Sequence, residues 1–240
     1  MNHRAQHREL ARTLLIDADD TLWENNIFYL ACTAHLIAFL ERQGFAPEAI
    51  QETLDTTEHR LIPTYGYGPV SYMRALGEAC RQLFVRRGQQ ASDYVIERCR
   101  AMAAPVLRPP IVLLPGVEAT LGALRPTSRL ILVTKGDMAT QQAKIDRSGL
   151  AHRFDACHIV PEKEPCHYIE IVAQHGLAPE STWMVGNSPK SDINPAIEAG
   201  IGAIWIPHAN TWTAEHQAIA YPDRVIELER FSDLTPHFEP

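Results

Sequence analysis

The chain has 240 residues, of which 45% are hydrophobic, and a formal net charge of -7 at neutral pH. Its length and apolar content can bury a sizeable core, and its negative charge argues against a broad surface for nucleic acid or membrane. No apolar run approaches the roughly 20 residues of a membrane span, and the opening MNHRAQHREL is too polar for the core of a signal peptide, so we expect a cytoplasmic protein. The cysteines are scattered without a CxxC pair, which favours buried, reduced thiols at Cys32, Cys80, Cys99, Cys157 and Cys166.

The first predicted element is a buried strand near residues 12–16, whose apolar run leads directly into two carboxylates. The following pattern, up to about Val106, is helical throughout. Prolines at positions 105, 109 and 110 close this block. We expect four helices in it, which begin near Ile27, Pro47, Val70 and Ser92.

Short apolar runs then alternate with helical segments, which is the pattern of a parallel sheet covered by helices. The chain therefore predicts an α/β fold with a parallel five-stranded sheet, formed by residues 1–23 and 107–240, and an inserted all-helical unit at residues 24–106. Glycines 149, 176 and 200 are the expected C-caps of the intervening helices. The four later strands are predicted at residues 129–134, 154–160, 181–186 and 202–207.

Two acids at the end of the first strand are the strongest candidates for chemistry. Asp17 and Asp19 point to one side of an extended chain. Two anions so close repel by roughly 4 kcal/mol at an effective dielectric constant of about 20, so a bound cation or a proton must compensate. With Mg²⁺, one carboxylate can attack phosphorus while the other, protonated, assists the leaving group. The alternative is a pair of acids that only caps a turn.

The exits of the next three strands also carry polar candidates, and ligands gather at this edge of such a sheet. Thr134 and Lys135 end the second strand, where a hydroxyl and backbone amides can hold a phosphoryl oxygen. Lys163 follows the third and can neutralise a carboxylate and a phosphoryl group. Asn187 and Asp192 follow the fourth. Taken singly, each also fits a turn, a helix cap or a solvated loop.

The order of these four signals, from Leu14 to about Pro207, resembles the haloacid dehalogenase superfamily of hydrolases, in particular its phosphatases. The resemblance implies a Rossmann-like three-layer core, a helical cap, and Mg²⁺-dependent hydrolysis of a small phosphorylated metabolite through an aspartyl-phosphate. It makes Asp17 the nucleophile and Asp19 the general acid and base. It implies phosphate contacts for Thr134 and Lys163, and Mg²⁺ ligands from Asp17, the carbonyl of Asp19, and Asp192.

Two positions depart from the family pattern. Asn187 stands where many members carry a second acid, and an amide oxygen there still accepts a hydrogen bond but lacks the charge. We expect the site to survive this change, with Asn187 acting through a metal-bound water. Asp20 stands where glycine is common, and Asp tolerates the left-handed conformation better than most residues, so we expect the turn to persist.

Other chemistries are less consistent with the sequence. Haloacid dehalogenases resemble the phosphatases but lack the second acid, so Asp19 argues for phosphate. Phosphonate-cleaving relatives use a lysine of the cap, and residues 24–110 contain none. A receiver domain of a signalling pathway also combines acids, a threonine and a lysine, but such a domain is about half the size of this chain. A non-catalytic phosphate-binding or signalling protein of the same fold remains as an alternative, motivated by Asn187.

The substrate is the least determined feature. We expect no nucleic acid or membrane partner, and a monomer or homodimer. Within the helical insertion, the segment PTYGYGPVSYMR can reach into the cleft, although Tyr72 better fits helix packing. The candidate contacts or hinge residues are Asn25, Asn26, Tyr65, Tyr67, Arg74, Trp205 and His208.

Overall fold

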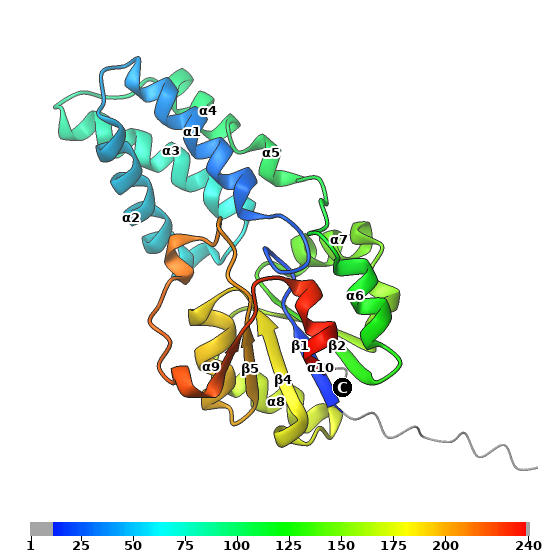
Figure 1. Ribbon diagram of the computed structural model, residues 1–240. Helices are drawn as coiled ribbons and strands as arrows, with labels where there is room; N and C mark the ends of the chain where they lie inside the picture. The colour runs from blue at the N-terminus through cyan, green and yellow to red at the C-terminus, as the bar shows by residue number, and fades with distance from the viewer. Residues whose placement is uncertain (1–11, 239–240) are drawn as a thin grey trace, which may run out of the picture.

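The computed structural model describes residues 12–238, which form a sheet with helices on both faces and a separate block of helices beside it (Figure 1). All six strands are parallel, in the order β3-β2-β1-β4-β5-β6. The α/β fold is confirmed, but the predicted number of five strands is wrong by one. The strands are β1 (Arg12–Ile16), β2 (Ser128–Lys135), β3 (Ala156–Val160), β4 (Thr182–Gly186), β5 (Gly202–Trp205) and β6 (Val225–Glu227).

The missed strand, β6, is three residues long and pairs with β5 at the edge of the sheet. So short a segment shows no clear alternation of apolar and polar residues. The five predicted strands are present, and β1 lies between β2 and β4, so its end faces the middle of the sheet edge. The acids that follow β1 are therefore flanked by the exits of two other strands.

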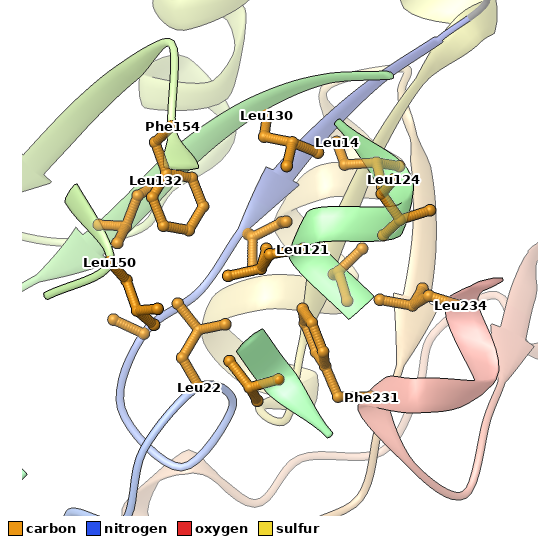
Figure 2. Packing of buried hydrophobic residues seen from close by; sticks show 14 of the residues in the cluster. Leu14, Leu22, Leu121, Leu124, Leu130, Leu132, Leu150, Phe154, Phe231 and Leu234 are labelled. Carbon is orange, nitrogen blue, oxygen red and sulfur yellow. The ribbon is translucent and has the colours of Figure 1, made fainter. Parts of the chain in front are cut away.

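Alternate residues of the central strands pack into two apolar layers. On one face, Leu14 and Ile16 of β1 pack with Leu130 and Leu132 of β2 against helix α6 (Figure 2). On the other, Leu15 and its neighbours pack against α8 and α9. The helices of this part are α6 (Val117–Leu124), α7 (Met138–Ser148), α8 (Pro165–His175), α9 (Asn194–Glu198) and α10 (Leu234–Phe238).

The helical block comprises five helices inserted between β1 and α6, and its buried residues, from Cys32 to Val106, form a cluster of their own. Ser92 caps α4 as predicted, with its hydroxyl accepting from the backbone N–H of Val95. A domain boundary at residues 23/24 and 106/107 remains a prediction. The helices are α1 (Asn26–Glu41), α2 (Pro47–Tyr65), α3 (Pro69–Arg86), α4 (Asp93–Ala101) and α5 (Ala104–Leu107).

Three of the five thiols are buried as predicted, at Cys32, Cys80 and Cys99. Cys157 and Cys166 are exposed, so that expectation is wrong for them, because β3 is near the edge of the sheet and Cys166 lies in the first turn of α8. Among residues 12–238 no helix has the length and apolar character required to cross a bilayer.

We expect Leu121→Ala to lower the free energy of unfolding by about 2–5 kcal/mol, because Leu121 is fully buried between α6 and the sheet and its truncation leaves a cavity. Urea denaturation followed by circular dichroism measures this change. Glu118→Ala, on the exposed side of the same helix, is the control and should change stability by less than about 0.5 kcal/mol. Equal effects of the two substitutions would contradict the packing described.

Candidate active site

A cavity of about 410 Å³ lies where the carboxyl ends of the strands meet the helical block. The loops after β1, β2, β3 and β4 line it from the sheet, α1 to α3 line it from the helical block, and residues 209–216 line it from the loop after β5. Six of the seven predicted site residues border this one cavity, namely Asp17, Asp19, Lys135, Lys163, Asn187 and Asp192.

Asp17 and Asp192 share one lysine at the base of the cavity. The Lys163 ammonium lies 2.5 Å from Asp17 Oδ1 and 2.6 Å from Asp192 Oδ1, and all three residues are buried. The backbone N–H of Asp17 donates to Val185 on β4, which extends the strand pairing up to the carboxylate. The Thr21 hydroxyl donates to Asp17 Oδ2 at 2.9 Å. The Asp17 side chain is thus held from both of its oxygens.

The two carboxylates carry more negative charge than Lys163 neutralises. Burial raises the pKa of Asp17 to about 7, Lys163 opposes this rise, and Asp192 adds to it. The pKa of Lys163 is raised, because the attraction of Asp17 and Asp192 outweighs the effect of burial. Buried like charges of this kind favour binding of a further cation.

The chemistry of the donors fits Mg²⁺. Asp17 and Asp192 are carboxylates that meet at the Lys163 ammonium, and Asn187 adds an amide oxygen 3.3 Å from the Thr21 hydroxyl. Mg²⁺ prefers such oxygen ligands, about six of them, including water and substrate oxygens. A separate group of Asp20, Glu24 and His208 mixes nitrogen and oxygen donors.

Asp19 has a lysine of its own. Its Oδ2 accepts from Lys144 Nζ at 2.5 Å and from Gln141 Nε2 at 3.0 Å, and its Oδ1 accepts from Trp23 Nε1 at 2.7 Å. Burial alone would raise the pKa of Asp19, but Lys144 and these hydrogen bonds outweigh it and lower that pKa. Part of the compensation expected for the acid pair is thus supplied by two lysines, Lys144 at Asp19 and Lys163, which Asp17 shares with Asp192.

The turn after the acid pair is built on Asp20. This residue has a φ of 60° and is the single non-glycine residue with positive φ between residues 12 and 238. Its Oδ1 accepts from the backbone N–H groups of Asn25 and Asn26, at 2.8 and 3.1 Å. The Asp20 side chain therefore stabilises a backbone turn for which glycine is usually needed, and it fixes the start of α1.

Asp192 is positioned by a tight segment after β4. Its Oδ2 accepts from the backbone N–H of Ser188 at 2.9 Å, within the turn formed by Pro189–Ile193. Gly186 lies so close that an added Cβ would be 2.3 Å from Asp192 Oδ2, so no side chain fits there. Asn187 Nδ2 donates to Thr211 Oγ1 at 2.9 Å, which connects this segment to the loop after β5.

Thr134 and Lys135 lie at the end of β2 but differ in their surroundings. Thr134 is buried and is the one predicted site residue absent from the cavity lining. The Lys135 ammonium is 2.6 Å from Glu215, 3.1 Å from Glu162 and 2.8 Å from the Ser191 hydroxyl. Two carboxylates thus already neutralise Lys135.

Tyr67 connects the helical block to this network. Its hydroxyl donates to Glu162 Oε2 at 2.6 Å, and its ring lies 4.3 Å from Lys135 Nζ. Tyr72 is buried and packs edge-on against Tyr29, as expected for a helix-packing residue. Tyr65 is half exposed and does not border the cavity.

The remaining candidates from the sequence take supporting positions. Arg74 lies over the ring of Tyr65, outside the cavity. Asn25 accepts from Lys144, and Asn26 donates to the carbonyl of Asn210. Trp205 donates to the Asn187 carbonyl, and His208 lies 3.5 Å from Glu24.

Several residues of the site were not predicted, because their partners are remote in the sequence. Only Thr21 offers a local signal, since it follows Asp17 by four residues and closes a hydrogen bond within the same loop. The others lie on helix faces or in polar loops that also fit solvent exposure: Gln141, Lys144, Glu162, Ser188, Ser191 and Glu215.

The chain is similar to several known proteins. A haloacid dehalogenase-like hydrolase from Xanthomonas campestris has a similar structure, with a TM-score of 0.81 and 28% identity over 97% of this chain and 93% of that one. A phosphoserine phosphatase from Thermus thermophilus is 27% identical over 81% of this chain and 88% of its own length. The N-acylneuraminate-9-phosphatase of mouse is 33% identical, but over only 40% of this chain and 41% of that protein.

The family model for hydrolases described as haloacid dehalogenase-like matches residues 11–200, which include both strand-end acids, Lys163 and Asp192. The match covers most of the 240 residues. The chain belongs to the haloacid dehalogenase-like hydrolases.

Proposed function

We propose that the protein is a Mg²⁺-dependent phosphomonoester hydrolase that works through an aspartyl-phosphate. The observation that carries this proposal is the pair Asp17 and Asp19 at the edge of one cavity, with Asp19 paired to Lys144 and Asp17 sharing Lys163 with Asp192. The relatives named above as phosphatases support it.

In the first half of the reaction, an oxygen of Asp17 attacks phosphorus and the bond from phosphorus to the ester oxygen breaks. Lys163 holds Asp17 in place and offsets the charge on the phosphoryl oxygens. Asn187 is the proposed phosphate contact that borders the cavity, and Thr134, which is absent from the lining, can join it only after a local shift at the end of β2. Lys135 can join them only by leaving Glu162 and Glu215, so its present contacts favour a role in holding Tyr67.

Asp19 transfers the protons. In the first half it gives a proton to the departing ester oxygen, and in the second it takes one from the water that attacks the aspartyl-phosphate. This second attack restores Asp17 and releases inorganic phosphate. The contact with Lys144 stabilises the ionised form that the second half needs. Protonation for the first half therefore requires Asp19 to separate from Lys144.

Asp17, Asp192 and the backbone carbonyl of Asp19 would hold the Mg²⁺ ion. When bound, the ion would supply positive charge that offsets the charge of the phosphoryl oxygens. Asn187 would act on it through a water molecule.

A dehalogenase is the second candidate, since solved dehalogenases share the fold. In a dehalogenase, hydrolysis of the ester intermediate needs no proton for an oxygen leaving group, so Asp19 would have no role. In this chain, however, three side chains hold Asp19 at the cavity. Incubation with 2-haloacids and with a panel of phosphate esters, with halide and phosphate release both measured, separates the two. Halide release without phosphate release would overturn the proposal, and stable phosphate on Asp17 without turnover would indicate a signalling role.

We expect Asp19→Asn to reduce steady-state hydrolysis of alkyl phosphates by about 10²–10⁴-fold, because their leaving group needs a proton. With p-nitrophenyl phosphate, whose leaving group departs without one, the first turnover should persist and the aspartyl-phosphate should accumulate. Rapid-quench measurement of p-nitrophenol tests this as a burst. Asp17→Asn is the control and should give no burst with either ester. Equal loss of the first turnover for both esters in Asp19→Asn would contradict the role of Asp19.

We expect Lys163→Met to lower the free energy of unfolding by about 3–5 kcal/mol in metal-free buffer, because it leaves Asp17 and Asp192 as unpaired buried charges. Added Mg²⁺ should then stabilise the variant more than the native chain. Urea denaturation with EDTA and with Mg²⁺ measures both effects. Lys190→Met, at an exposed lysine, is the matched control and should behave as the native chain. No Mg²⁺ effect in any of the three proteins would contradict the proposed metal site.

A further inference from the structure

On the side of the helical block, one face of α2 forms part of the cavity wall. Gln51, Asp55, Glu58 and Ile62 recur at helical spacing and all border the cavity. The opposite face of α2 carries its buried residues, among them Leu54, and packs inside the helical block. Because that packing fixes the rotation of α2 about its axis, the carboxylates of Asp55 and Glu58 are held at the cavity.

The charges of the cavity are arranged unequally. Its three lysines all come from the sheet side, and each is paired with acids of the sheet side or of the loop after β5. The helical block contributes no arginine or lysine to the lining. Within the described residues Glu58 has no ion pair and no hydrogen bond, and burial together with Asp55 raises the pKa of Glu58 to about 8. A positive group is missing from this end of the cavity.

Aromatic rings border the same end. Tyr29 and Trp212 line the cavity, from α1 and from the loop after β5. Trp212 stacks on His59 of α2, with ring centroids 6.0 Å apart, which places its indole beside the helix that carries Glu58. Aromatic faces attract cations such as ammonium groups, and most strongly when water is excluded.

We propose that the substrate carries an ammonium group at the end remote from its phosphate, and that Glu58 and Asp55 bind this group. This inference rests on the proposed function for the phosphate end, where Asp17 and Lys163 lie. With its raised pKa, Glu58 is largely protonated near neutral pH while the cavity is empty, and an ammonium group beside it would favour its carboxylate form. An anionic group at this end would gain no such partner. Glu58 and Asp55 therefore determine specificity and take no part in the bond-breaking steps.

The test uses pairs of esters that differ only in charge. Aminoethyl, aminobutyl and aminohexyl phosphate are compared with propyl, pentyl and heptyl phosphate, in which a methyl group replaces the ammonium. We expect the native chain to prefer the ammonium ester by at least about tenfold in kcat/KM at the length that spans the cavity. Glu58→Gln and Asp55→Asn should each lower kcat/KM for that ester by about tenfold and leave its alkyl partner unchanged. Glu52→Gln, at an exposed acid of α2 outside the cavity, should change neither.

A binding measurement separates this inference from the proposed function. Calorimetric titration of the Asp17→Asn protein with the same esters reports the ammonium preference without turnover. Ammonium-selective binding that Glu58→Gln removes, with no hydrolysis of any ester by the native chain, would support the inference and overturn the proposed function. Hydrolysis of both series with equal kcat/KM, and equal binding of both, would overturn the inference alone.

Discussion

The shared contact of Lys163 with Asp17 and Asp192 is the constraint on which the site depends. These three residues come from the loops after β3, β1 and β4, so one buried ammonium joins three strand exits. Removal of Lys163 would leave two buried carboxylates without a counter-charge, which is costly. The sheet order, with β1 between β2 and β4, is what makes this convergence possible. Fold and site are therefore not independent properties of this chain.

The helical block is joined to the rest of the chain by polar contacts more than by apolar packing. Its buried cluster is separate from the two clusters that flank the sheet. Across the cavity it is connected by Tyr67 with Glu162 and by Asn26 with Asn210. Polar contacts at the border of a cavity can be replaced by contacts with solvent or substrate at small cost. A movement of the block over a substrate, as in enzyme lids, would therefore leave the three apolar clusters intact.

The sequence predicted the parts of the structure that depend on local pattern. Apolar runs identified five strands, and the strand-end positions brought Asp17, Lys163 and Asp192 to one edge. It could not predict pairs set by tertiary packing. Lys144 meets Asp19 from 125 positions away, and no local pattern distinguishes it from a solvated lysine of a helix. Likewise Lys135 is neutralised by Glu215, 80 positions later, which turns an expected phosphate contact into part of a network.

In this structure, Asp17 and Asp19 have environments opposite to those that their proposed first roles would require. A nucleophile should be ionised, yet burial raises the pKa of Asp17; a general acid should be protonated, yet Lys144 and its neighbours lower the pKa of Asp19. A phosphate dianion in the cavity changes both balances. It competes with Asp19 for Lys144 and repels the Asp19 charge, which favours protonation of Asp19. A cation that arrives with it offsets the charge of Asp17 and favours ionisation there. In the proposed mechanism, the bound substrate would therefore create the protonation states that its own cleavage needs.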